Sequence, residues 1–65
     1  YENFVCKVNG GGMANYYMTG VQVIRKTGSG ALVEPGSASD VVEGDKVVVA
    51  VDYGNLMEIF VYKDN

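Results

Sequence analysis

Residues 41–55, VVEGDKVVVAVDYGN, decide the fold of this chain because they place a continuous apolar segment between two turns. Five small apolar residues, 47–51, follow Gly-Asp-Lys and precede Asp-Tyr-Gly-Asn. A strand with one face in water alternates apolar and polar residues, and this segment does not. Its second face therefore needs a cover, which is either the rest of the same chain or a second chain.

The last third of the chain predicts a β-hairpin. Segments 45–53 and 56–63 flank Gly54-Asn55, and a two-residue Gly-Asn loop favours a primed turn whose twist matches the strands. That loop predicts one register, with Val51 opposite Glu58, Val49 opposite Phe60, Val47 opposite Tyr62, Ala50 opposite Ile59 and Val48 opposite Val61. The same register sets Lys46 opposite Lys63 and Asp45 opposite Asp64. Like charges directly opposite destabilise a sheet, so either the strand ends fray or the loop is longer than two residues.

In this register both faces of the hairpin are apolar. The larger face holds Val47, Val49, Val51, Tyr53, Leu56, Phe60 and Tyr62, and the smaller face holds Val48, Ala50, Met57, Ile59 and Val61. Two structures explain the pattern. Either a bulge or bend turns part of each strand inward, as in a small barrel or tight sandwich, or the sheet packs its second face against another chain.

The rest of the chain also predicts strands. Segment 2–8 places Phe4, Cys6 and Val8 on one face. Segments 13–18 and 21–26 follow, joined through a bulge at Gly20, because interior glycines often mark bulges. After a turn at 27–30, a short strand at 31–34 ends at Pro35-Gly36. Residues 40–43 predict one capped helical turn, with Asp40 as the cap, Glu43 three residues later and Gly44 as the left-handed terminator.

These elements predict an all-β fold over a single domain, residues 1–65. We expect a small five-stranded barrel, SH3-like or OB-like, or a compact β-sandwich, with at most a single helical turn near 40–43. A domain this short buries only about 60% of its unfolded surface and needs extra stabilisation. Cys6 is the one cysteine, so no intrachain disulfide supplies it, and we expect this thiol to act as a small buried hydrophobe. Because the chain starts at Tyr1, we expect a processed chain or an excised domain.

Composition excludes several classes of function. The chain has no histidine, which removes Ser-His and Cys-His nucleophile pairs and the usual zinc sites. Its net charge of −3 argues against a nucleic-acid footprint, and no apolar run reaches the length of about 18 residues that a membrane span needs. Glu58 is the one acid in the middle of a predicted strand, with no second acid placed beside it. We therefore expect no enzyme and no cofactor.

The acids at 40, 43 and 45 are the only candidates for a metal site. Oxygen ligands at this spacing suit Ca²⁺ in principle. However, Asp40, Glu43 and Asp45 do not match a calcium-binding loop, and capping accounts for two of the three. We therefore expect no metal.

The sequence predicts a contact surface made of tyrosines and one face of the hairpin. Tyrosine joins a large apolar area to a polar tip and is enriched at interfaces. The candidate interface residues are Tyr16, Tyr17, Val48, Ala50, Tyr53, Met57, Ile59, Val61 and Tyr62. The expected function is a non-catalytic binding or assembly module, a homo-oligomer or part of a surface or virion-type structure.

Two alternatives stay open. A nucleic-acid-binding barrel needs its basic residues on one face with tyrosines between them; these residues are Lys7, Arg25, Lys26, Lys46 and Lys63. A carbohydrate-binding module needs exposed, coplanar tyrosines.

Overall fold

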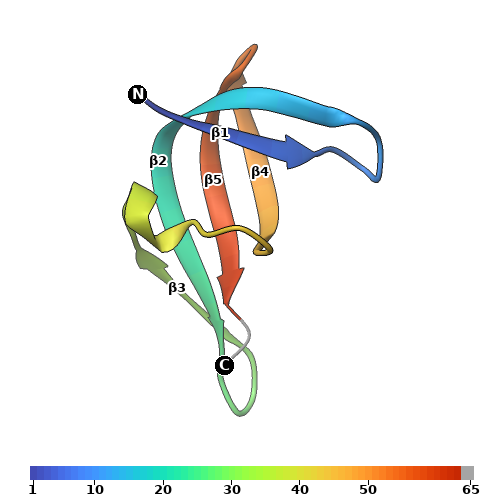
Figure 1. Ribbon diagram of the computed structural model, residues 1–65. Coiled ribbons are helices and arrows are strands. Elements are labelled where there is room, and N and C mark those ends of the chain that lie inside the picture. Colours follow the sequence, from blue (N-terminus) through green and yellow to red (C-terminus); the bar gives the residue numbers. More distant parts are fainter. Residues whose placement is uncertain (64–65) are drawn as a thin grey trace.

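The computed structural model describes residues 1–63, with the backbone alone for Asp52, and shows five strands and one helical turn (Figure 1). The elements are β1 (Glu2–Lys7), β2 (Met13–Lys26), β3 (Ala31–Pro35), the 3₁₀ turn η1 (Ala38–Asp40), β4 (Lys46–Tyr53) and β5 (Leu56–Lys63). The all-β prediction is confirmed, and the bounds of the expected strands agree to within one residue. The described residues contain no helix long and apolar enough to cross a membrane.

Strand β2 organises the sheet. One edge of β2 pairs antiparallel with β1 over its first half and with β3 over its second half. The other edge pairs parallel with β5, and β5 pairs antiparallel with β4. Only β4 makes no backbone ladder with β2, so this strand connects almost every part of the chain.

The expected bulge in β2 is confirmed. Met18 lies opposite Met57 and Gly20 lies opposite Glu58, so Thr19 is the extra residue. A bulge re-aims the side chains that follow it. Tyr16 points to the core before the bulge, and Val21 and Val23 are buried after it. One 14-residue strand therefore serves two parts of the core.

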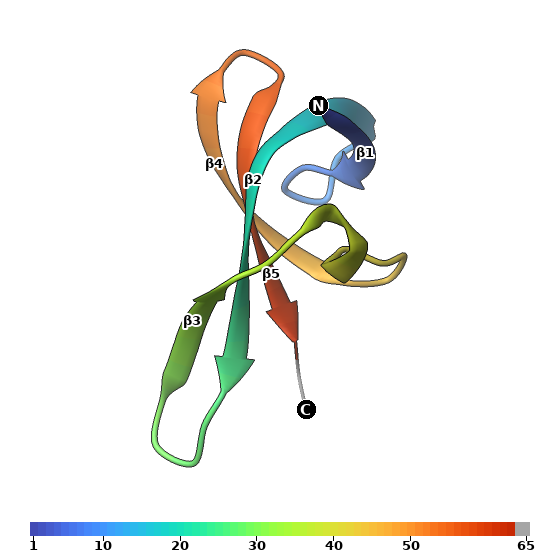
Figure 2. The same ribbon diagram turned by 90° about the vertical axis from the view of Figure 1, so that its left-hand side faces the viewer.

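The sheet is not closed into a barrel. Strands β1 and β4 stand at the two ends of the strand order β1-β2-β5-β4, and no ladder joins them. Residues 1–63 also hold no second sheet that would make a sandwich. The structure is a single twisted sheet, with β1 and η1 lying on the same side of β2 and β5 (Figure 2). The expected barrel or sandwich is therefore not confirmed.

The core lies between the concave inner face of this sheet and the two segments that cover it, β1 and residues 36–45. Its buried side chains are Phe4, Val21, Val23, Met57, Ile59 and Val61. Gly36 fits closely under the cover: a Cβ atom there would lie 2.8 Å from Cγ2 of Val23 and 2.9 Å from Oδ2 of Asp40. The cover can therefore approach the sheet only because this position lacks a side chain.

The predicted register of the hairpin is wrong by one residue. The Gly54-Asn55 loop is present, with Tyr53 opposite Leu56, but Asp52 is an extra residue in β4. Beyond this bulge the pairs are Val51–Met57, Ala50–Glu58, Val49–Ile59, Val48–Phe60 and Val47–Val61. A slip of one residue exchanges the faces of a strand. Val47 and Val49 therefore share the inner face with Ile59 and Val61, whereas Val48 and Ala50 share the outer face with Phe60.

The observed register also removes the charge conflict of the predicted one. Lys46 lies opposite Tyr62 instead of Lys63. Asp45 forms an ion pair with Lys63, and the expected contact with Asp64 lies outside the described residues. The bulge at Asp52 is thus the physical reason that Lys46 and Lys63 do not face each other.

The single helical turn lies earlier than predicted. It covers 38–40 instead of 40–43, so Asp40 ends the turn and does not begin it. The carboxylate of Asp40 accepts a hydrogen bond from the backbone N–H of Ser37, the N-cap residue, at 2.8 Å. Gly44 has the predicted positive φ, +94°. It does not end the helical turn as predicted, because the turn ends at Asp40 with Val41 as its C-cap.

Candidate interaction surface

The outer face of the sheet is largely apolar and uncovered. The registers of β4, β5, β2 and β3 place residues of four strands in cross-strand rows on this face. We define the outer patch as the apolar residues Ile24, Val33, Val48, Ala50, Phe60 and Tyr62. One polar residue, Gln22 of β2, lies beside Phe60 in the same row. No described element packs on this side (Figures 1 and 2).

The exposure of the outer patch is unusual for a sheet face in water. Val48 and Val33 are 49% and 53% exposed. Phe60, Tyr62 and Ile24 are half-buried. A solvated face would carry polar residues at these positions. Contiguous apolar patches on small proteins often mark interaction sites.

The outer patch continues toward the hairpin tip through three larger side chains. Tyr53 of β4, Leu56 of β5 and Tyr17 of β2 form one row, because Tyr53 pairs with Leu56 and Leu56 pairs with Tyr17. The Tyr17 N–H also donates to the Asn55 carbonyl at 2.9 Å, which fixes β2 to the loop. Both tyrosines are exposed, so the tip adds aromatic contact area to the face.

Glu58 and Lys46 stand on the outer face, on opposite sides of Phe60. Glu58 precedes Phe60 by two residues, and Lys46 lies opposite Tyr62, which follows Phe60 by two. The Glu58 side chain lies over Gly20, where a Cβ atom would be 3.5 Å from its Oε2 atom. Within residues 1–63, neither Glu58 nor Lys46 forms an ion pair.

The structure brings together five of the nine predicted interface residues. Tyr17, Val48, Ala50, Tyr53 and Tyr62 all lie on the outer face. The other four lie on the inner face: Met57, Ile59 and Val61 are buried in the core, and the ring of Tyr16 packs against Phe4 at 5.5 Å between centroids. The prediction that Met57, Ile59 and Val61 share a face with Val48 is therefore wrong, because it used the slipped register.

Sequence reasoning missed three residues of the outer patch, Ile24, Val33 and Phe60. Phe60 was assigned to the face of Val49, again because of the register. Ile24 and Val33 join the patch only through the parallel pairing of β2 with β5 and the pairing of β3 with β2. The predicted like-charge pairs, Lys46 with Lys63 and Asp45 with Asp64, were the sequence signals that the register needed a shift.

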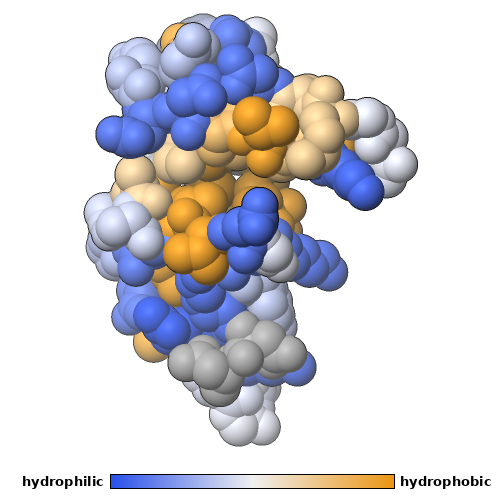
Figure 3. Space-filling model, viewed as in Figure 1, coloured by the Kyte–Doolittle hydropathy of each residue, from blue (hydrophilic) through white to orange (hydrophobic). Residues whose placement is uncertain are grey.

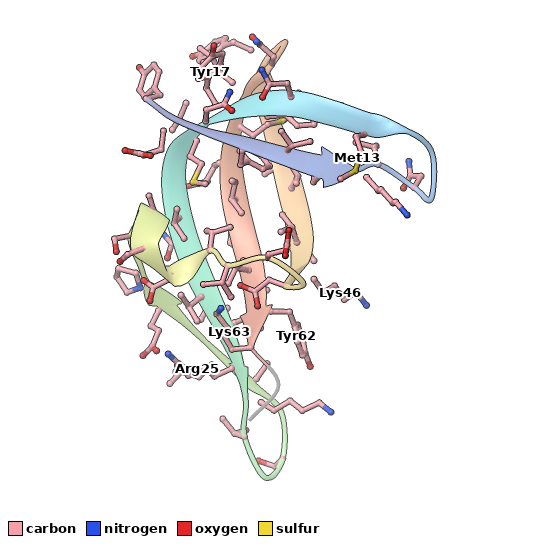
Figure 4. All side chains as sticks on the ribbon, viewed as in Figure 1. Met13, Tyr17, Arg25, Lys46, Tyr62 and Lys63 are labelled. Carbon is pink, nitrogen blue, oxygen red and sulfur yellow. The ribbon has the colours of Figure 1, made fainter. Side chains whose placement is uncertain are left out.

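A second candidate site is a basic pocket at the end of the sheet. Arg25, Lys26, Lys46 and Lys63 line it together with Tyr62, and Figure 4 shows Arg25, Lys46, Tyr62 and Lys63 gathered at this end. Lys7, the fifth basic residue, lies on β1 away from it. The pocket thus brings four of the five basic residues together beside a tyrosine, as a nucleic-acid surface would need.

Acidic side chains offset much of this positive charge. Arg25 pairs with Glu34 at 2.7 Å, and Lys63 pairs with Asp45. The hydrogen bonds from Lys63 and from the Val42 N–H hold the pKa of Asp45 below its ordinary value, so this carboxylate stays ionised beside the lysine. The pocket is therefore a mixed-charge site whose positive charge is only partly available to an anion.

The third candidate is an apolar groove on the concave side. It runs between β1 and the start of β4 and is lined by Phe4, Cys6, Met18, Val41 and Val47, among others; Figure 3 shows hydrophobic atoms gathered there. The same side chains form or contact the core. Burial raises the pKa of the Cys6 thiol, which fits the predicted role of this cysteine as a small hydrophobe.

Two of the three acidic residues of the 36–45 segment, Asp40 and Asp45, have structural partners. Asp40 accepts the Ser37 N–H, and Asp45 accepts the Val42 N–H and the Lys63 ammonium. Among the described residues, no three acidic or cysteine side chains come together as metal ligands would. These carboxylates therefore act as caps and clamps for the segment that covers the core.

Comparisons with other proteins add no relative. The chain matches no protein-family model, no curated protein and no solved structure at a significant level. A function must therefore be argued from the geometry of the outer patch and of the basic pocket.

Proposed function

We propose that this domain is a non-catalytic assembly module that joins copies of its own chain through the outer patch. The single observation that carries the proposal is the uncovered apolar face of Val48, Phe60, Tyr62 and Ile24, which replaces the polar face of a solvated sheet. Packing this face against a second copy would remove apolar area from water, worth about 25 cal/mol per Å². It would also supply the stabilisation that so short a chain lacks.

The expected affinity follows from the size of the face. Four strands spaced about 4.8 Å apart and four rows about 6.8 Å apart give a flat area of about 400 to 500 Å². A stable interface of standard size buries about 800 Å² on each partner. We therefore expect a reversible dimer with a dissociation constant in the micromolar to millimolar range.

Light scattering across a dilution series tests the proposal. The native mass should rise toward twice the 7.0 kDa of the chain as concentration increases. Val48→Lys should remain a folded monomer throughout the series. Val5→Lys is the matched control, because Val5 is 55% exposed, close to the 49% of Val48, but lies on β1 away from the outer patch. A monomer at millimolar concentration in the wild type would contradict the proposal.

The basic pocket supports a second candidate function, binding of single-stranded nucleic acid. The supporting observation is that four of the five basic side chains of the chain line one pocket beside Tyr62, on which a base could stack. Anisotropy of a labelled oligonucleotide should then rise on adding protein, and the effect should weaken steeply between about 50 and 200 mM salt. An unchanged anisotropy at low salt would eliminate this candidate.

A further inference from the structure

We infer that the copies pack face to face about a two-fold axis that crosses β5 at Phe60, with Glu58 of each copy paired to Lys46 of the other. This inference depends on the proposed function, because it specifies the partner and the contacts of the same outer patch. It also gives a role to Glu58, the acid that sequence reasoning could place in a strand but could not explain.

The argument starts from the order of rows on the outer face. Along β5 the outward residues are Leu56, Glu58, Phe60 and Tyr62. The last three lie opposite Ala50, Val48 and Lys46 of β4. The middle pair, Phe60 with Val48, is apolar. The rows on its two sides carry opposite charges, one negative at Glu58 and one positive at Lys46.

A two-fold axis requires a surface that complements itself. In such an interface residue i contacts j and residue j contacts i. An axis that crosses the strands at the Phe60 row leaves that row facing its own copy and exchanges the two charged rows. Glu58 then lies over the Tyr62 row of the partner, one strand away from Lys46 and within reach of its long side chain. Two equivalent ion pairs form around an apolar centre.

Other arrangements leave these charges without partners. Neither Glu58 nor Lys46 has an ion pair within the described part of its own chain. A face-to-face contact whose axis ran along the strands would keep each row at its own level, so Glu58 would meet the Glu58 row of the second copy. Burying like charges in this way disfavours that arrangement.

Charge reversal tests the pairing directly. Lys46→Glu and Glu58→Lys should each weaken self-association at least about tenfold, because each places like charges together twice in the dimer. An equal mixture of the two variants should associate again as a heterodimer, within about threefold of the wild-type dissociation constant. In that heterodimer the two substituted side chains face each other across one half of the interface, and the unchanged Glu58 and Lys46 face each other across the other half. Both ion pairs are then restored between different chains.

Sedimentation velocity of each variant and of the mixture measures these outcomes, with circular dichroism to confirm that both variants are folded. Lys7→Glu and Glu43→Lys are the charge-matched controls, because both residues are exposed and neither lies on the strands that form the outer patch. Restored association in the mixture supports the arrangement. If the wild type dimerises but neither variant weakens it, or the mixture stays monomeric, the two-fold arrangement is overturned and the assembly function stands. If the wild type never dimerises, both proposals fail.

Discussion

The inner and outer faces of this sheet have similar side chains and opposite surroundings. Ile59 and Phe60 are neighbours in β5, and both are large and apolar. Ile59 is fully buried beneath β1 and the 36–45 segment, whereas Phe60 stands on a face that no described element covers. Hydrophobicity alone therefore does not tell a core face from a contact face here. The covering segments, held by Gly36 and Asp45, make the difference.

The largest expected effect separates the two faces with one kind of substitution. Ile59→Lys should unfold the domain, because an unpaired charge in the core costs several kcal/mol, comparable to the whole stability of so small a protein. Val48→Lys places the same charge on the outer face, one strand away, and should change the free energy of unfolding by less than about 0.5 kcal/mol. Urea denaturation followed by circular dichroism measures both at a protein concentration where the wild type is monomeric. If both variants lost the same free energy of unfolding, the outer face would also be part of the core.

The second effect tests how closely the 36–45 segment packs on the inner face of the sheet. Gly36→Ala should destabilise by about 1 to 3 kcal/mol, because the new methyl group would press on Val23 and Asp40. Gly28→Ala is the control, since a Cβ atom there meets nothing within 4 Å. The difference between their urea midpoints measures the closeness of the fit. A tolerated alanine at 36 would show that the cover is loosely held.

The third effect concerns the clamp that fastens the cover to β5. The pKa of Asp45 is lower in the folded chain than in the unfolded one. The ionised carboxylate therefore contributes its full stabilisation of the fold above the pKa that Asp45 has in the unfolded chain, near pH 4. This stabilisation is lost as the pH falls through the lower pKa that Asp45 has in the folded chain. At pH 7, Asp45→Asn should therefore be less stable than the wild type by about 1 kcal/mol. This gap should narrow below about pH 4. A gap that stays constant as the solution is acidified well below that value would contradict the clamp.

The smallest effect is expected at the other ion pair of the same end. The side chains of Arg25 and Glu34 are 39% and 41% exposed, against 21% and 15% for Lys63 and Asp45. Solvent screens an exposed pair, so Glu34→Gln should cost less than about 0.5 kcal/mol at pH 7. The measurement is again urea denaturation, beside Asp45→Asn. A larger loss for Glu34→Gln would reverse the ranking of the two pairs.

Most strands were predictable from the sequence, because local signals determine them. Glycine and proline at 28, 30, 35 and 36 mark the turns, and Gly54-Asn55 marks the hairpin. The bulge at Thr19 was predictable from Gly20 alone. The bulge at Asp52 was not. The predicted like-charge pairs indicated an error in the register, but no local signal showed which residue of the strand was the extra one. That single residue moved Met57, Ile59 and Val61 from the expected contact face to the core.

The composition of the outer patch was only partly predictable, because it depends on pairings between distant segments. Val48 and Tyr62 belong to one hairpin, and local reasoning placed both in the interface. Ile24 reaches the patch through a parallel ladder, and Val33 reaches it through β2. Alternation within a strand says which residues share a face, but it does not say which strands become neighbours.

The parallel pairing of β2 with β5 has a consequence for how fast the chain folds. The β2–β3 and β4–β5 hairpins join residues close in sequence and can form within microseconds. The β2–β5 ladder joins Tyr17 to Leu56 and Arg25 to Lys63, positions 38 or 39 apart, so it closes a long loop before its contacts stabilise the chain. We therefore expect the meeting of the two hairpins to limit the folding rate. Until they meet, both apolar faces of β5 are in water, so the nascent chain is most prone to aggregate at this step.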